Sequence, residues 1–209
     1  MKLLVILCVA IVAGFVVANE SIPECDRYDC PSYSLLYNNQ TASIQIREYE
    51  AARWARTKVQ SFYYEKAVNI GFNRLFDYIT GENADGIDID MTAPVAVQVI
   101  PGPGPFCEST FIISFYVPSA YQEPNAAPPA PTSSDVYIET LPETTKAVQM
   151  FPGYVTQWNE LVEPISELVE FCDEQGYQYV SNVETVCGYD SPFHVANRHN
   201  EIWIDVWNY

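Results

Sequence analysis

The sequence predicts an α+β fold built from two similar units, each with the order strand, helix, strand, strand. Apolar residues recur at helical spacing in two segments of the 209-residue chain, and runs rich in β-branched and aromatic residues flank both segments in the same order. A Pro/Ala-rich stretch, residues 118–134, separates the units. Neither half alone offers both faces of a closed core. We therefore interpret residues 33–209 as one domain, with halves at about 33–117 and 135–209 joined by a surface connection.

The first unit begins with an extended run over residues 43–59. Gly81 is expected to end the helix that follows, because glycine readily adopts the left-handed conformation found after helix ends. Residues 87–100 and 111–117 have the composition of strands, and a Pro/Gly turn at residues 101–105 joins them. The residues that recur at helical spacing are Ala67, Gly71, Leu75 and Tyr78, beside Phe72, Phe76 and Ile79.

The second unit repeats this order. Residues 136–151 form an extended run, a helix is expected at about 155–174, and residues 177–187 and 201–207 have strand composition. Pro164 predicts a kink or a late start of this helix, because proline cannot donate a backbone hydrogen bond and clashes with the preceding turn. One side of the helix carries Leu161, Ile165, Leu168, Val169 and Cys172.

The N-terminus has the pattern of a cleaved secretory signal peptide, residues 1–18, with cleavage after Ala18. A transmembrane helix is the alternative, but about 15 apolar residues fall short of the roughly 20 that a bilayer requires. Residues 19–32 form a short lead before the domain. Secretion makes the sequon at Asn39 a predicted glycosylation site.

The chain is strongly acidic, with 27 Asp and Glu against 10 Lys and Arg and a formal charge of −17. Such a field repels nucleic acid and anionic membranes, so neither is an expected partner. The acidity favours solubility, and binding of a cationic partner, of mineral or of calcium is the alternative. Residues 83–88 resemble the middle of a calcium-binding EF-hand loop, but Gly81 and Thr92 occupy its first and twelfth positions. We interpret this segment as a turn.

Five cysteines remain after Cys8 leaves with the signal peptide, and an oxidising compartment favours disulfides. Their odd number leaves at least one thiol unpaired or in a link between chains, and Cys107 is a candidate for it. Their spacing does not determine the pairing. The disulfide candidates are Cys25, Cys30, Cys172 and Cys187.

Four sequence blocks, taken together, resemble the SOUL heme-binding domain over about residues 33–207. They are residues 46–49 with Trp54, residues 71–81 leading to 91–95, residues 104–106 with 108–110, and residues 188–193 followed by 197–203. The resemblance implies a curved antiparallel sheet or open β-barrel flanked by two helices. It also implies a small hydrophobic tetrapyrrole, heme or another porphyrin, as ligand.

The resemblance places the porphyrin against an apolar surface near the first helix. That helix offers Phe72, Leu75, Phe76 and Ile79, on which a flat macrocycle could stack. The alternative is that these side chains pack the sheet. Helical spacing favours the core for most of them, which leaves one or two to face the ligand.

One branch of the family carries a histidine, proposed as an iron ligand, where this chain has Glu48. A carboxylate binds ferric heme more weakly than imidazole does. The only histidines are His194 and His199, so His194 is the candidate metal ligand, with a solvated or hydrogen-bonded role as the alternative. Arg198 is a candidate partner for the propionates, and its alternative role is to bind turn carbonyls and fix the loop. On the helix, Lys66 and Arg74 are the only cations available for the propionates.

No hydrolase or transferase motif is present, so we predict a non-enzymatic protein. The sequence indicates a secreted protein that binds heme or another tetrapyrrole in an apolar pocket with weak or no axial ligation, and that scavenges, transports or displays it. The alternative is an acidic extracellular structural or interaction protein of the same fold, whose pocket takes another hydrophobic ligand or none.

Overall fold

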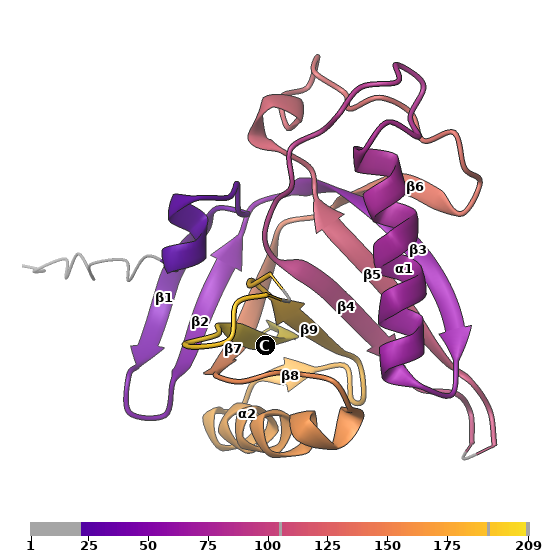
Figure 1. The fold of residues 1–209 in the computed structure, drawn as a ribbon. Helices are drawn as coiled ribbons and strands as arrows, with labels where there is room; N and C mark the ends of the chain where they lie inside the picture. Colours follow the sequence, from indigo (N-terminus) through magenta and orange to yellow (C-terminus); the bar gives the residue numbers. More distant parts are fainter. Residues whose placement is uncertain (1–21, 105, 192, 208–209) are drawn as a thin grey trace, which may run out of the picture.

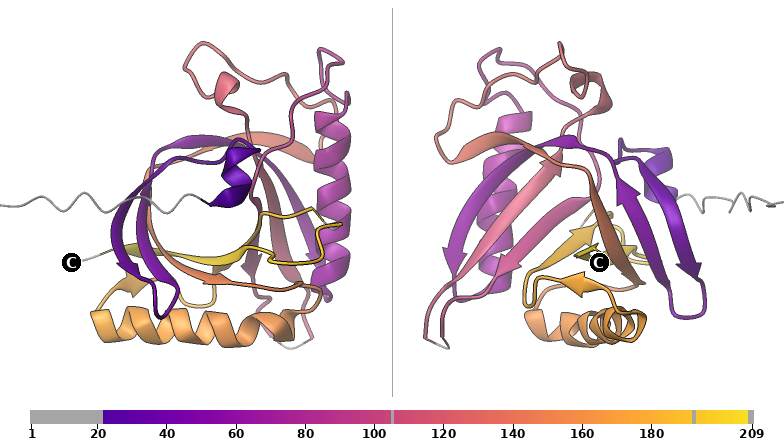
Figure 2. Two further views of the ribbon diagram at one scale, coloured as in Figure 1. Left: turned by 60° about the vertical axis from the view of Figure 1, so that its left-hand side comes forward. Right: turned by 180° about the vertical axis from the view of Figure 1, so that it is seen from behind.

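One antiparallel sheet runs through both halves of the chain in the computed structural model, which describes residues 22–104, 106–191 and 193–207 (Figure 1). The strand order is β1-β2-β7-β10-β9-β4-β5-β3-β6, with β8 paired to β10 beside this path. The sheet is strongly curved but stays open, because β1 and β6 form its two edges (Figure 2). The strands are β1 (Tyr33–Asn39), β2 (Ile44–Tyr49), β3 (Ala52–Ser61), β4 (Val95–Ile100), β5 (Ser109–Tyr116), β6 (Val136–Leu141), β7 (Thr144–Phe151), β8 (Gln178–Tyr179), β9 (Glu184–Gly188) and β10 (Asn200–Trp207).

The predicted repeat is visible in the strand order. The sequence β2-β7-β10-β9 is followed by β4-β5-β3-β6, so the two halves of the sheet mirror each other across the β4/β9 pair. Each half also pairs one of its strands with a strand of the other half, since β2 pairs with β7 and β6 pairs with β3. Neither half can therefore complete its part of the sheet alone.

Two helices cover the outer face of the curve (Figure 2). Helix α1 (Tyr64–Ile79) packs on β3 and β5, and α2 (Val162–Gln175) packs on β7 and β10. The main hydrophobic core lies between these helices and the sheet, where Leu75 of α1, Leu168 of α2 and Ile113 of β5 are fully buried. The predicted α+β class and the curved sheet with two flanking helices are confirmed. No helix in the described part of the chain is long and apolar enough to span a membrane.

Several predicted boundaries differ from the observed ones. The runs at residues 43–59 and 136–151 are each two strands, β2 with β3 and β6 with β7, rather than one. Residues 87–94, predicted as part of a strand, form a loop. At its start, the Asn83 side chain forms hydrogen bonds with backbone groups of Tyr78 and Ile87. The 3-10 turn η3 (Trp158–Leu161) precedes α2, so the late start that Pro164 predicted is observed.

The N-terminal lead folds against the inner face of the sheet. Its 3-10 turn η1 (Pro23–Asp26) is closed by a disulfide between Cys25 and Cys30. The Asp29 carbonyl accepts a hydrogen bond from the Ala93 amide at 3.0 Å, and the Asp29 carboxylate accepts one from the Ser119 amide at 2.8 Å. The lead is thus held to the body of the protein; the predicted signal peptide lies outside the described residues.

The other two disulfide candidates require a correction. Cys172 and Cys187 are both buried free thiols, and Cys107 is an exposed one. Cys172 packs in the core beneath the helices, whereas Cys187 packs in the second core, on the inner face of the sheet. The sheet separates the two sulfurs, so they cannot form the bond that their positions in the sequence allowed.

The predicted glycosylation site lies where β1 turns into β2. The Oδ1 atom of Asn39 accepts a hydrogen bond from the Ala42 amide at 3.1 Å, and the residue is half-buried at the sheet edge. Glycosylation of Asn39 stays a prediction.

Candidate functional site

A groove on the outer face lies between α1 and the loop that connects β9 to β10. Two adjoining cavities of about 320 and 190 Å³ form it, and both are lined by Phe72, Val95, Gly188 and Asp190. We call their combined surface the α1 groove. It contains residues from both halves of the chain, because β4 and β9 meet at the centre of the sheet.

Helix α1 contributes one apolar wall. Phe72 and Phe76, one turn apart, lie nearly parallel with ring centroids 5.8 Å apart. Phe72 also packs edge-on against Phe115 of β5 at 5.3 Å, which fixes its position. Phe76 remains 44% exposed. Two parallel aromatic rings are therefore held at the groove surface, where a flat apolar ligand could pack against them.

The four predicted helix residues divide between two roles. Phe72 and Phe76 line the groove, whereas Leu75 is fully buried and Ile79 is 6% exposed, both in the core against the sheet. The spacing of a helix explains this division, because residues 72 and 76 share one side and 75 and 79 the next. Leu75 and Ile79 are positioned to support the helix and not to touch a ligand in the groove.

The opposite wall is a loop that Arg198 holds together. Its guanidinium donates hydrogen bonds to the carbonyls of Asp190, Ser191 and His194 at 3.3, 2.8 and 2.8 Å. It also stacks over the Tyr154 ring, with 4.4 Å from the guanidinium carbon to the ring centroid. These contacts match the loop-fixing role that was the alternative for Arg198, although the side chain does line the groove.

His194 is fixed by the carboxylate of Asp190, which contacts its Nδ1 atom. The imidazole is 44% exposed, and Nε2 has no hydrogen-bond partner among the described residues. Burial disfavours the charged form of Asp190 and by itself would raise the pKa of its carboxyl. Hydrogen bonds from the His199 amide and from His194 nevertheless lower the pKa of this carboxyl below its ordinary value. His194 itself is not among the lining residues of the groove, but Asp190 is.

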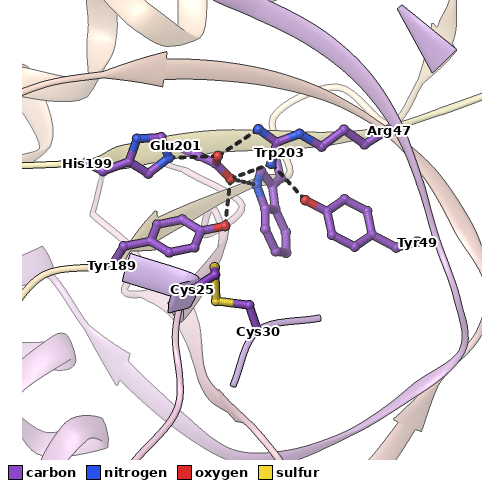
Figure 3. Close-up of a disulfide and its surroundings, with 8 residues drawn as sticks. All are labelled: Cys25, Cys30, Arg47, Tyr49, Tyr189, His199, Glu201 and Trp203. Atoms are coloured by element: carbon purple, nitrogen blue, oxygen red, sulfur yellow. Dashed lines mark hydrogen bonds and ion pairs between the residues drawn. A yellow bond between two sulfur atoms is a disulfide. The ribbon is translucent and has the colours of Figure 1, made fainter. Parts of the chain in front are cut away.

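His199 belongs to a separate, buried network centred on Glu201 (Figure 3). Its Nε2 atom lies 2.9 Å from Glu201 Oε1. Tyr189 and Trp203 donate to Glu201 Oε2 at 2.8 and 2.6 Å, and Arg47 forms an ion pair with the carboxylate at 2.9 Å. Both charged side chains are almost completely inaccessible to solvent.

This network joins two sequence blocks that lie 154 residues apart. Arg47 comes from β2 and Glu201 from β10, two strands that are not neighbours because β7 lies between them. Tyr189 belongs to this network and also lines the groove. The buried ion pair therefore anchors the base of the groove loop.

The alternating pattern of β2 is the sequence signal for this network. Gln45, Arg47 and Tyr49 alternate with Ile44 and Ile46 in β2, and all five are buried. Such alternation places the polar set on the inner face of the sheet. Gln45 accepts from Arg47 Nε at 2.6 Å and Tyr49 from Arg47 Nη1 at 3.0 Å, so the set completes the network.

Glu48 does not belong to either site. It follows Arg47 in β2, so its side chain points to the opposite face of the sheet, and it is exposed. It is not a lining residue of the α1 groove. The residue at this position therefore has no direct effect on a ligand in the groove.

The described residues contain no group of three or more His, Cys, Asp or Glu side chains that could hold a metal ion. Residues 83–88 form a turn, as predicted, in which the Gly86 amide donates to the Asn83 carbonyl at 3.0 Å. Asn83 also uses its side-chain amide to hold the turn, by donating to the carbonyls of Tyr78 and Ile87 at 2.9 and 2.7 Å.

Comparisons with known proteins match most of the chain. The family model described as SOUL heme-binding protein matches residues 28–205. Human heme-binding protein 2 is 41% identical over 166 residues, which cover 79% of this chain and 78% of the human protein. Heme-binding protein 1 of Xenopus laevis is 30% identical over 161 residues, covering 77% and 82%. Among solved structures, the EcmrR C-terminal domain aligns with a TM-score of 0.61 at 10% identity, covering 79% of this chain and 98% of that one, a likeness of fold alone.

Proposed function

Because the chain belongs to the SOUL heme-binding protein family, we propose that it binds heme or a related tetrapyrrole in the α1 groove. One observation carries the proposal. The parallel rings of Phe72 and Phe76 lie across the groove from the loop whose Asp190 lines the groove and binds His194.

The size and lining of the groove fit such a ligand. The larger of its two cavities, about 320 Å³, falls within the range of roughly 300–1,000 Å³ typical of small-molecule sites, and the smaller one, about 190 Å³, adjoins it. Val68, Val95 and Met91 extend the apolar surface around the two phenylalanines. The main source of affinity is then burial of the flat ring system, with stacking as a smaller contribution.

His194 is the residue best placed to bind iron. A histidine that binds a metal usually donates its other ring N–H to a carboxylate, which fixes the ring and raises its basicity. Asp190 contacts Nδ1 of His194 in this way and leaves Nε2 available. His199 directs its Nε2 to Glu201 instead. When heme is bound, its iron supplies a metal that can accept an imidazole nitrogen.

Basic side chains of the groove would do little to bind the propionate groups of heme. Arg198 is the one basic lining residue of the groove among those described, and it is occupied with three loop carbonyls. Arg74 binds Asp135, Thr57 and the Lys58 carbonyl, away from the groove. Binding therefore depends on burial, so iron-free porphyrin should bind nearly as well as heme.

We propose further that the protein is secreted and acts without catalysis, as a scavenger, carrier or display protein for the pigment. The N-terminal signal pattern supports secretion. The disulfide between Cys25 and Cys30 is consistent with an oxidising compartment.

The hydrogen bonds that tie Arg198 to loop carbonyls favour a second candidate function. A groove without a free cation also suits an uncharged hydrophobic ligand. The protein would then be an acidic extracellular interaction protein that retains the fold without heme.

Titration with hemin and with iron-free protoporphyrin, followed by absorbance and calorimetry, separates these functions. Saturable binding of both at similar affinity is the expected result. His194→Ala should shift the visible spectrum of bound hemin but leave protoporphyrin binding unchanged, whereas Phe193→Ala, at a 91% exposed position of the same loop, should alter neither. Binding of neither porphyrin would rule out the proposal and leave the second candidate.

A further inference from the structure

A second cavity, of about 230 Å³, lies on the inner face of the sheet, opposite the side that carries the helices. Alternation along the strands separates it from the α1 groove. On β4, Val95 and Val97 line the groove, whereas Ala96 and Gln98 line this cavity. On β9 the same division falls between Val186 and Thr185. The two sites share no lining residue, and we call the second one the inner cavity.

Aromatic side chains form much of its wall. Trp54, Trp203 and Tyr49 all line it and are 4–5% exposed. Tyr49 and Trp203 pack with ring centroids 4.9 Å apart, so their positions are fixed. The ammonium of Lys146, another lining residue, lies 5.6 Å from the Trp203 ring centroid. A positive charge therefore already lies over the Trp203 ring, as the π-electrons of an indole favour.

The basic residues of the inner cavity are already neutralised. Arg56 forms an ion pair with Glu139 and also donates to Ser114 and Gln98. Lys146 forms an ion pair with Asp205. An anionic ligand would have to displace one of these carboxylates, and it would do so in a protein of formal charge −17.

Two acidic lining residues have no such partner. Glu50 and Glu143 are exposed and make no ion pair or side-chain hydrogen bond among the residues that the structure describes. The inner cavity consequently keeps an excess of two negative charges beside its aromatic wall. Its charge and its surface both suit a ligand that is aromatic and positively charged.

We propose that the inner cavity binds a small organic cation with one or two aromatic rings. The rings would lie against Trp54 and Trp203, and the cationic group would lie near Glu50 and Glu143. The volume of about 230 Å³ is below the size of most drug-like sites, which limits the ligand to a small molecule. The site would operate independently of tetrapyrrole binding in the α1 groove.

Phenyltrimethylammonium is a suitable probe, because tert-butylbenzene has the same shape without the charge. Calorimetric titration should show saturable binding of the cation and much weaker binding of the neutral compound and of benzenesulfonate. Affinity should fall as salt is raised, since exposed carboxylates are screened. Equal binding of the charged and neutral probes, preference for the sulfonate, or no binding of the cation would overturn the proposal.

Paired variants locate the site. Glu50→Gln combined with Glu143→Gln should weaken phenyltrimethylammonium binding about fivefold to tenfold, as the loss of two partly screened charge interactions predicts. Glu65→Gln removes a carboxylate that lines the α1 groove and not the inner cavity, so it should leave the affinity for phenyltrimethylammonium unchanged. All three positions are exposed, so the variants should fold, which circular dichroism would verify. An equal effect of Glu65→Gln would contradict the assignment, and saturating hemin should leave the affinity for the cation unchanged.

Discussion

At Glu201, four neighbouring side chains converge on one carboxylate that no solvent reaches. Burial by itself would raise the pKa of this group. The charge of Arg47, followed by a hydrogen bond from His199, instead lowers the pKa to about 2. Burial also raises the pKa of Tyr49 and of Tyr189, so both phenols remain protonated and available as donors.

Removing the charge from Glu201 should destabilise the protein severely. Glu201→Gln leaves Arg47 as an unpaired buried cation, and the loss of one partner from such a pair costs about 3–5 kcal/mol. Urea unfolding measures the difference. Asp135→Asn is the matched control, because it breaks the half-exposed pair with Arg74 and should cost less than about 1 kcal/mol. Equal effects of the two substitutions would refute the anchoring role of Glu201.

The same carboxylate predicts how stability depends on pH. A pKa of about 2 in the folded state lies below the ordinary value of 4.5, so the unfolded chain binds the proton more readily. The stabilisation is complete above about pH 4.5 and is lost as the pH falls towards 2. The free energy of unfolding of the wild type should therefore decrease over that window more steeply than that of Glu201→Gln. Parallel curves for the two proteins would show that Glu201 is not the group responsible.

Local sequence identified the residues of the groove better than those of the network. Phe72, Phe76 and Arg198 were predicted from the helix pattern and the family blocks, and each lines the α1 groove. The pairing of Arg47 with Glu201 depends on β2 and β10 both pairing with β7. No pattern within either block specifies that arrangement, so the network had to be seen in the structure.

At the scale of elements, α1 determines the groove because it lies very close to the sheet. A Cβ atom added at Gly71 would lie 2.5 Å from the side chain of Ile113 on β5. The glycine therefore permits an approach that no other residue allows. This close contact sets the depth at which Phe72 and Phe76 lie beside the loop.

Gly71→Ala should push α1 away from β5 and destabilise the protein by about 1–3 kcal/mol, the usual effect of overpacking a core. Gly104→Ala is the control, since a Cβ atom there meets nothing within 4 Å and the backbone has no positive φ. Thermal unfolding compares the two variants. An unchanged melting temperature for Gly71→Ala would mean that the helix is free to shift.

The positions of the helices were predicted from the sequence more accurately than those of the strands. Helical spacing located both helices, and Gly81 follows α1 with a positive φ of 112°, as its predicted role as a helix stop requires. Strand composition did not reveal β1 or the break between β2 and β3 at Glu50 and Ala51. Hydrogen bonds to distant partners decide where a strand ends, and those partners are not visible in a local pattern.

At the scale of the whole molecule, the exchange of strands makes the two halves interdependent. A fragment of residues 22–117 lacks β7 for β2 and β6 for β3, so it should be unfolded alone by circular dichroism. Mixing it with a fragment of residues 118–209 should restore the sheet signal. Cooperative unfolding of the first fragment by itself would contradict this interdependence.

The sheet also separates two sites of different character. The α1 groove lies on the outer face and uses parts of both halves, whereas the inner cavity lies on the other face beside an excess of carboxylates.

The most direct test of the account is the affinity for hemin of Phe76→Glu compared with Phe62→Glu. Both substitutions place a carboxylate at an exposed phenylalanine, 44% and 59% accessible respectively, but only Phe76 lines the groove. We expect Phe76→Glu to bind hemin at least about tenfold more weakly, which corresponds to 1.4 kcal/mol, and Phe62→Glu to bind like the wild type. Equal affinities in two folded variants would place the tetrapyrrole elsewhere and contradict the central claim.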